Sequence, residues 1–398
     1  MLKKEKEVAK RNRGKIPYTA VDHVFDDRSG EKQISWWTNG FWGGMMWQLY
    51  QASKDEVFRD NAVFTEEKMD AVFLDYNGMD HDAGFRWLPT AVARYRLTGD
   101  ETSKNRGLLA AANLAGRFNM NGNFIRAWND WGDERDTTGW AIIDCMMNLP
   151  LLYWASDVLK DPRFTRIAMS HADTSAKHFI RQDGSVRHIV GFDPYTGEFD
   201  RDYGGQGIGE GSSWTRGQTW ALYGFGMTYL HTGEEKYLKI ARKVADTFIA
   251  KIPENGLIPV DFDQPEDCTW QDSTAGAIAS CGLLLLSSLL DGSVSCTPAC
   301  GSRYYTGPRS PKTEEPFSNT APAPVSDPAG ATKYLDAALK MLKALDRENC
   351  DYDPSHDELV EKCTAAYHDA NHEFPILYGD YYFIEAIWKL TGKELYIW

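Results

Sequence analysis

Positive charge is scarce in this chain. Its 398 residues include 43 lysines and arginines against 57 aspartates and glutamates, which gives a formal net charge of -14. A field of this sign does not gather nucleic acid or anionic membranes, so we expect neither as a partner. A substrate that is itself anionic would need a local cationic pocket.

Long apolar stretches are also missing. Residues 1–7 are highly charged, and no apolar segment of the length of an export signal follows them. No run of residues approaches the roughly 20 apolar residues of a membrane-spanning helix. We therefore expect a soluble, cytoplasmic protein.

Cysteine spacing gives no metal or disulfide signature. Seven cysteines are scattered along the chain, without the paired spacings of a zinc site or the density of a secreted disulfide scaffold. Only Cys296 and Cys300 lie close together, and without a second pair we interpret them as two reduced thiols rather than half a metal site or a local disulfide. No pair of histidines with carboxylate support has metal-site spacing either. We predict no metal and no cofactor.

Helical patterns repeat along the whole chain. Apolar residues recur at three-to-four spacing in segments 108–118, 237–248 and 335–345, as in amphipathic helices. Similar four-residue segments place Gly99, Gly233 and Gly392 where a helix ends in a left-handed cap, and segments 51–55 and 157–162 look like degenerate copies. The sequence therefore predicts a repeated helical hairpin and an all-α fold.

The loops indicate how the hairpins are arranged. Repeated hairpins form either an open solenoid or a closed toroid, and strand-like alternation is too rare here for a parallel sheet. Loops 36–47, 129–140 and 203–220 are rich in Trp, Asp, Gly and His, which suits one shared pocket at the end of a closed barrel. We predict a single barrel domain over residues 1–398. A Pro-, Ser- and Gly-rich insertion near 293–331 is assigned no chemistry.

Two carboxylates have unusual surroundings. Asp144 stands alone in the apolar stretch 140–147, and removing water from a carboxylate raises its pKa, which is how a general acid keeps its proton near neutral pH. A buried aspartate that caps a helix or pairs with an arginine is the alternative. Asp82 follows His81 directly. Two separated carboxylates among tryptophans suggest sugar chemistry.

Aromatic loops accompany these carboxylates. Residues 36–44 hold three tryptophans, whose flat faces suit a pyranose ring, although each ring taken singly is equally at home in a core. Arg216 lies in a second such loop and can clamp a substrate carboxylate, the alternative being a pair with Glu210 or Asp202 at the base of the loop. His188 can donate to a substrate oxygen, but a lone histidine is more often structural.

Six motifs in order resemble the unsaturated glucuronyl hydrolases, glycoside hydrolase family 88. They span most of the chain and are Trp-Thr-Asn-Gly-Phe-Trp at 37–42, His-Asp-Ala-Gly-Phe at 81–85, Arg-Ala-Trp at 126–128, Ile-Ile-Asp-Cys-Met-Met-Asn at 142–148, Ser-Trp-Thr-Arg-Gly-Gln-Thr-Trp at 213–220 and Tyr-Gly-Asp-Tyr-Tyr-Phe at 378–383. The resemblance implies a six-hairpin (α/α)6 barrel, which agrees with the predicted repeat.

The resemblance also implies an activity. Such enzymes hydrate the C4=C5 vinyl ether of the terminal unsaturated uronic acid that lyases leave on glycosaminoglycan oligosaccharides, which would be the partner of this chain. Asp144 matches the acid/base that protonates C4 and activates the water added at C5. Asp82 matches the carboxylate that holds ring hydroxyls and, in its ionised form, supports the developing charge. Residues that match substrate contacts are His81, Trp37, Trp42, Trp128, His188, Gln206, Trp214, Arg216 and Trp220.

One departure from the family concerns sulfate. Members that act on sulfated fragments often carry a Ser-x-Ser-x-Lys cluster shortly before the Gly-Asp-Tyr-Tyr motif, whereas this chain has Asp369 and Glu373 there, which would repel sulfate. We therefore expect a preference for unsulfated or differently sulfated oligosaccharides.

Other activities remain open at this point. A related one is unsaturated rhamnogalacturonyl hydrolysis of pectin fragments. A different class is a sugar epimerase or isomerase on the same barrel, and a non-catalytic sugar-binding protein is the third.

Overall fold

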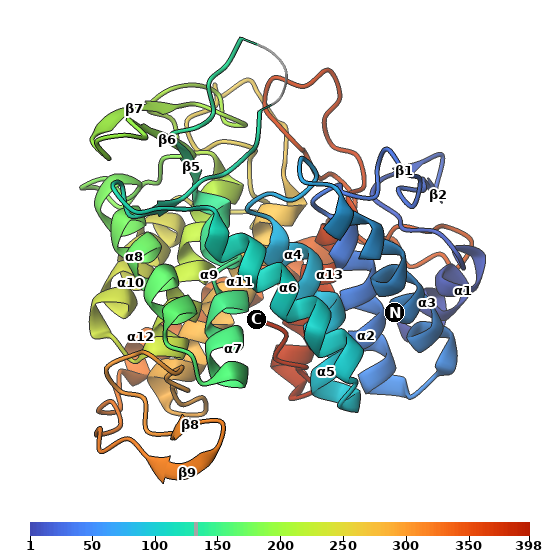
Figure 1. Cartoon of the computed structure of the whole chain (residues 1–398). Coiled ribbons are helices and arrows are strands. Elements are labelled where there is room, and N and C mark those ends of the chain that lie inside the picture. The colour runs from blue at the N-terminus through green and yellow to red at the C-terminus, as the bar shows by residue number, and fades with distance from the viewer. Residues whose placement is uncertain (131–133) are drawn as a thin grey trace.

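Six inner helical segments form a closed ring in the computed structural model, which describes residues 1–130 and 134–398 (Figure 1). Each inner segment contacts the next, and the ring closes where the last one packs against the first. In chain order they are α2 (Asn39–Ser53), the run α4 (Ala83–Trp87), η2 (Leu88–Val92) and α5 (Ala93–Thr98), then α7 (Pro150–Leu159), α9 (Thr215–Thr232), α11 (Ser273–Asp291) and α13 (Leu377–Thr391).

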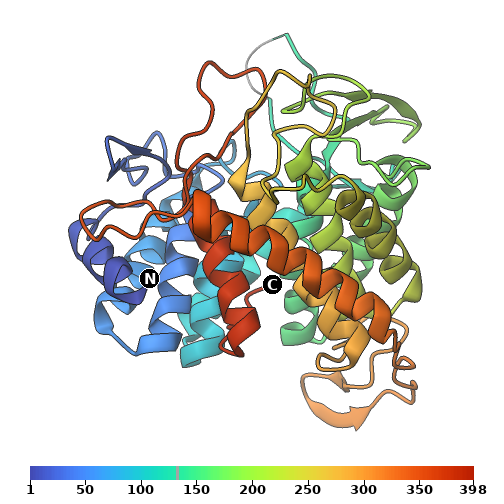
Figure 2. The same cartoon turned by 180° about the vertical axis from the view of Figure 1, so that it is seen from behind.

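An outer layer of helices surrounds this ring. Five outer helices each follow an inner one, and the N-terminal helix α1 packs beside α3 and α2 (Figures 1 and 2). The predicted (α/α)6 barrel is therefore confirmed. The outer helices are α1 (Leu2–Arg11), α3 (Glu56–Lys68), α6 (Glu101–Gly116), α8 (Arg163–His178), α10 (Glu235–Ala250) and α12 (Pro328–Glu348).

Burial patterns distinguish the two layers. Outer helices bury one stripe, as in α10, where the buried positions follow the three-to-four spacing that the sequence predicted. Inner helices bury more of their surface, and every residue of α9 is buried. Polar side chains on such an enclosed helix therefore need partners inside the protein.

Helix α11 corrects one expectation. Among the described residues it is long and apolar enough to cross a membrane, although we expected no such segment. However, 94% of its most apolar window is buried inside the barrel, where it packs against α9, α12 and α13. Its composition is that of an inner barrel helix.

Left-handed caps end every inner helix of the described chain. Gly99, Gly233 and Gly392 have φ of 72°, 69° and 67°, as predicted. Segments 51–55 and 157–162, the degenerate copies of the glycine segments, also form such caps, at Lys54 and Lys160. A sixth cap, at Gly292, was not predicted. Five of these caps, all except the one at Gly392, turn the chain from the inner layer to the outer one.

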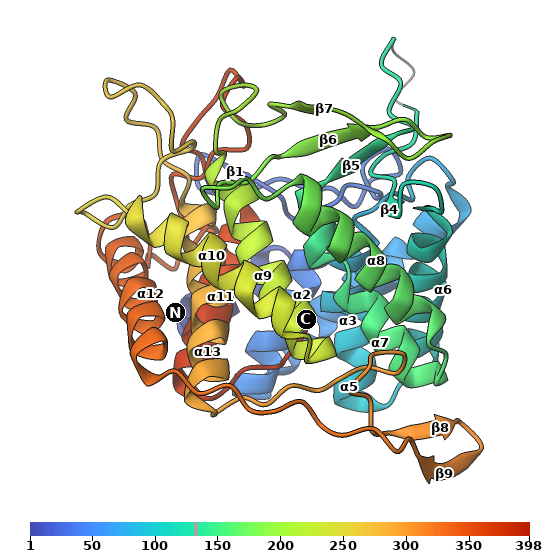
Figure 3. The ribbon, with the colours of Figure 1, turned by 90° about the vertical axis from the view of Figure 1, so that its left-hand side faces the viewer.

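Connecting loops gather at one end of the barrel (Figures 1 and 3). This loop end carries a three-stranded antiparallel sheet of β5 (Trp140–Ile142), β6 (Ile189–Phe192) and β7 (Phe199–Tyr203), and the hairpin of β1 (Ala20–Val21) and β2 (Val24–Phe25). The predicted insertion near 293–331 contains β8 (Pro308–Ser310) and β9 (Thr313–Pro316), which lie at the opposite end of the barrel (Figure 3). Cys296 and Cys300 are free thiols.

Candidate active site

Strand register brings Asp144 and His188 together. Ile142 in β5 pairs with Ile189 in β6, so the residues just beyond the paired ends of these strands become neighbours. Asp144 lies in the short 3-10 helix η3 (Ile143–Met147) that follows β5, and His188 directly precedes β6. The His188 Nε2 atom lies 3.3 Å from Asp144 Oδ1.

A backbone contact sets the tautomer of His188. The Gln206 N–H donates to His188 Nδ1 over 2.9 Å, so the proton of the neutral ring sits on Nε2 and faces Asp144. Gly205 makes this approach possible. Its φ is +57°, and a Cβ there would lie 2.1 Å from His188 Nδ1.

A second carboxylate, Asp82, reaches the same region through Asn148. The Asn148 side-chain amide donates to Asp82 Oδ1 and to the Asp144 backbone carbonyl, each over 3.3 Å. Its oxygen accepts from the Phe85 N–H over 2.7 Å. Gly84 leaves room for this amide, since a Cβ there would lie 2.5 Å from the Asn148 Cα. One buried amide therefore links the two aspartate segments.

Burial affects the two groups of the His81–Asp82 pair in opposite directions. Burial raises the pKa of Asp82 well above its ordinary value, and the nearby carboxylates of Asp80 and Asp144 add to this rise while Arg86 opposes it. Burial lowers the pKa of His81 well below its ordinary value, so its ring, 3.4 Å from Asp82, is neutral. We expected Asp82 to be ionised; in the structure it holds its proton more tightly than a solvated aspartate.

Asp82 and His188 both line a cavity of about 890 Å³ at the loop end of the barrel. Asp144 is 8% exposed and borders the cavity through His188, 3.3 Å away, although it is not one of the described residues that line the wall. The aromatic part of the wall consists of Trp36, Trp37, Trp128, Trp140 and Tyr203. A cavity of this size with aromatic walls suits a sugar ring.

Several predicted contacts do line this cavity, and others lie elsewhere. Trp37, Trp128, His188 and Gln206 are in the wall. His81 is 1% exposed and reaches the site through Asp82 and the edge of Trp128. Trp214 packs behind His188, with ring centroids 4.2 Å apart.

Trp42 and Trp220 correct the prediction. Both are completely buried in the hydrophobic core, where Trp42 packs on Phe25 and Trp220 on Phe85 and Tyr382. Their position on inner helices α2 and α9 explains this, because these helices bury most of their residues. For these two rings the core alternative is the correct one.

Arg216 is also not free to clamp a substrate. Its guanidinium is 1% exposed and pairs with Asp272 over 2.5 Å, rather than with Glu210 or Asp202. It also donates to the carbonyls of Thr364 and Ala365. Burial alone would lower the pKa of Arg216, but the surrounding acidic groups, with Asp272 first among them, together outweigh this effect and the pKa is raised.

Cationic residues that sequence reasoning missed lie in the cavity wall. They are Arg28, Lys32 and Arg135, from two loops that carry no recognisable motif. Proximity in the fold, and not spacing along the chain, is what brings them together. Asn148 ends one of the six motifs, but nothing in the sequence indicates which groups its side-chain amide contacts.

The sequence pattern of Glycosyl Hydrolase Family 88 matches residues 5–284. An unsaturated glucuronyl hydrolase of Bacillus sp. (strain GL1) is 33% identical over 91% of this chain and 88% of its own length. An unsaturated chondroitin disaccharide hydrolase of Streptococcus pyogenes serotype M1 is 30% identical over 88% of this chain and 80% of its own length.

Two solved structures are similar to the whole barrel. One is the unsaturated glucuronyl hydrolase from Bacillus sp. GL1, described as responsible for the degradation of glycosaminoglycan. The other is a variant described as UGL with dGlcA-Glc-Rha-Glc, an unsaturated oligosaccharide. Each has a TM-score of 0.83 and 30% identity, and each comparison covers 98% of this chain and 94% of the other.

The geometry of Arg216 predicts a stability defect. Arg216→Ala would leave Asp272 buried and uncompensated, so we expect the free energy of unfolding to fall by about 3–5 kcal/mol. Urea unfolding followed by tryptophan fluorescence measures this. Arg163→Ala, which removes an exposed pair with Asp161, is the matched control and should change it by less than about 1 kcal/mol. An Arg216→Ala protein as stable as the wild type would instead favour a free substrate clamp.

Proposed function

The chain belongs to Glycosyl Hydrolase Family 88 and is an unsaturated glucuronyl hydrolase; on this premise we propose that it releases the terminal 4,5-unsaturated uronic acid from lyase-generated glycosaminoglycan oligosaccharides by hydrating the C4=C5 vinyl ether. The observation that carries the proposal is the placement of Asp82 and Asp144, joined through Asn148, beside one tryptophan-walled cavity.

In this proposal Asp144 delivers and removes protons. Its acid form gives a proton to C4, and the resulting carboxylate takes a proton from the water whose oxygen bonds to C5. The hemiketal formed at C5 then opens, and the rest of the oligosaccharide departs. The Nε2–H of His188 faces Asp144 Oδ1 at 3.3 Å and restrains the position of the Asp144 side chain.

Asp82 acts as a neutral hydrogen-bonding group. A uronic acid brings its own negative charge into the cavity, and two ionised aspartates beside it would repel it. The raised pKa of Asp82, due to its burial, lets it keep its proton and donate to a ring hydroxyl. In this proposal Asp82 stays neutral while Asp144 alternates between its acid and carboxylate forms. The different environments of the two aspartates give them these different roles.

The substrate carboxylate needs a cationic partner, and Arg216 is committed to Asp272. Arg28, Lys32 and Arg135 line the cavity and supply positive charge at its wall. We assign the attraction of the uronate to these residues. Arg216 instead supports the site indirectly, since it stacks under Trp214, which packs on His188.

Asp144→Asn tests the proposed function. We expect turnover to fall by a factor on the order of 1,000 or more, because the amide cannot give up a proton in the same way. Turnover is followed as loss of the ultraviolet absorbance of the unsaturated ring, across glycosaminoglycan and pectin lyase products. Binding, measured by tryptophan fluorescence, should persist.

The control for that variant is Asp173→Asn on the exposed face of α8, which should turn over like the wild type. Wild-type turnover by Asp144→Asn would refute the acid/base role. Cleavage of pectin products alone would favour a rhamnogalacturonyl hydrolase, and an unchanged absorbance on every substrate would favour an isomerase or a binding protein.

Asn148→Ala tests the link between the aspartates. Loss of its amide leaves a buried oxygen of Asp82 without this donor and frees the Asp144 backbone, so we expect kcat to fall about 10- to 100-fold with a smaller change in KM. Asn349→Ala is the matched control. Asn349 is equally buried, but its amide donates to Gln271 and Ser273, so kcat should not change. Equal effects on the two variants would contradict the linking role.

Sulfate selectivity is a further expected outcome. The Tyr367 N–H donates to the carbonyl of Gln206, a residue of the cavity wall, and this contact supports a role for the nearby Asp369 and Glu373 in repelling sulfate. We expect a higher kcat/KM for the unsulfated chondroitin disaccharide than for the 6-sulfated one, and Asp369→Asn should narrow the difference. Faster cleavage of the sulfated disaccharide would refute this expectation.

A further inference from the structure

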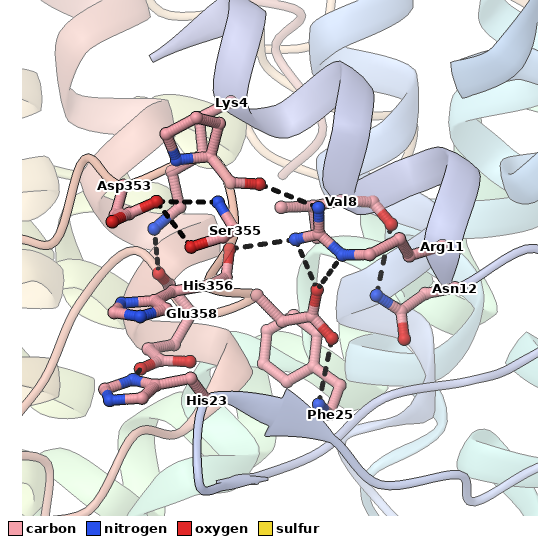
Figure 4. A network of polar contacts seen from close by, with 12 residues as sticks. Lys4, Val8, Arg11, Asn12, His23, Phe25, Asp353, Ser355, His356 and Glu358 are labelled. Carbon is pink, nitrogen blue, oxygen red and sulfur yellow. Dashed lines mark hydrogen bonds and ion pairs between the residues drawn. The ribbon is translucent and has the colours of Figure 1, made fainter.

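Four potential metal ligands meet outside the described wall of the cavity. Figure 4 shows three of them, His23, His356 and Glu358. His23 lies in the two-residue turn between β1 and β2. Asp351, His356 and Glu358 lie in the segment between α12 and α13. One donor atom from each residue lies within 4.8 Å of the donors of the other three. Sequence spacing could not indicate this cluster, because His23 and the other residues come from opposite ends of the chain.

The four side chains form two histidine–carboxylate pairs. His23 Nδ1 lies 2.5 Å from Glu358 Oε1, and His356 Nδ1 lies 2.6 Å from Asp351 Oδ2. The two imidazole rings stack, with centroids 3.6 Å apart and planes within 7° of parallel. Two imidazole nitrogens and two carboxylate oxygens therefore lie within one small volume, and the parallel rings need to tilt for both nitrogens to face one ion.

Glu358 gives an independent indication of a ligand. It is 1% exposed, and its Oε2 atom is buried without a hydrogen-bond partner in the described part of the chain. Leaving a charged oxygen in this state costs more than the roughly 1–3 kcal/mol of a neutral group. A cation bound at the cluster would compensate this oxygen.

Surrounding contacts hold the ligand segment in place without using the ligand atoms. Asp380 accepts from the backbone N–H groups of Leu359 and Val360 over 3.1 and 2.7 Å. Lys4 donates to the backbone carbonyls of Asp351 and Glu358 over 2.8 and 2.5 Å. The Lys4 ammonium is 3.6 Å from Asp351 Oδ1, so it offsets only part of the negative charge of the cluster. Such supporting contacts are what orient ligands around a bound metal.

We propose that His23, Asp351, His356 and Glu358 bind a divalent transition-metal cation, with zinc as the best match. Two neutral imidazoles and two carboxylates carry a net charge of about -2, which a divalent ion neutralises, and mixed nitrogen and oxygen ligands suit tetrahedral zinc. In a tetrahedral zinc site the ligand atoms lie about 3.3 Å apart. The nitrogen and oxygen atoms of each histidine–carboxylate pair therefore need to move apart by less than about 1 Å. The half-exposed His23 side chain gives the ion a path from solvent.

Such an ion would be structural. All four ligand positions are filled by protein, so no open position is left for a substrate. The ion would fasten the β1–β2 hairpin, and with it the connection from α1, to the segment that leads into α13.

The test uses the full chain, stripped of metal with a chelator and titrated with Co²⁺. We expect one equivalent to give the intense visible absorption of a tetrahedral cobalt site, and Zn²⁺ to abolish it by competition. In His23→Ala/His356→Ala, which loses two of the four donors, Co²⁺ affinity should fall on the order of 100-fold or more. The matched control is His178→Ala/His368→Ala, which removes two histidines outside the cluster and should bind like the wild type.

Thermal unfolding supplies a second readout that does not depend on catalysis. Zn²⁺ should raise the unfolding temperature of the wild type and of the control, but not that of His23→Ala/His356→Ala, because a ligand of the native state stabilises it by mass action. The proposal would be overturned if the wild type lacked the cobalt absorption, or if the two double variants responded equally to cobalt and zinc. The cluster would then consist only of two hydrogen-bonded histidine–carboxylate pairs. Neither result would bear on the hydrolase activity.

Discussion

The buried ion pair of Arg216 and Asp272 is the interaction on which the arrangement of the loop end depends. Through one guanidinium it joins the start of α9 to the start of α11 and to the carbonyls of the segment at 364–365. That segment in turn accepts from the Gln206 side chain, and Gln206 fixes the tautomer of His188. The contacts of one buried charge thus extend to His188, which faces Asp144. Because both side chains are buried, loss of either one would leave the other as an unpaired charge in the protein interior.

Much of the fold follows from local sequence, because local physics determines it. The sequence shows the glycine caps, the amphipathic stripes of the outer helices and the repeated helix-ending segments. Lys54 and Lys160, in the degenerate copies of these segments, also adopt the left-handed conformation. What distinguishes Trp42 from Trp37 is not visible in this way. Both occur in one glycine-rich loop motif, but one faces the core and the other the cavity, and this depends on which neighbours the closed ring supplies.

Some members of the candidate site were predictable from the sequence, but their charge states were not. The motif resemblance brought Asp82, Asp144 and His188 forward, and strand register and Asn148 bring them together in the fold. The direction of the pKa shift of Asp82 depends on desolvation and on Asp80, Asp144 and Arg86, which only the three-dimensional arrangement reveals. The same reason explains Arg216, whose partner Asp272 lies outside its own loop.

The β8–β9 hairpin lies on the rim opposite the aromatic cavity (Figure 3). Its two short strands project from the barrel, and the contacts that shape the cavity all belong to the other rim. Length and composition can therefore vary in this segment during evolution under little constraint from catalysis. It is also a natural attachment point for immobilising the protein on a solid support with the mouth of the cavity directed toward the solution.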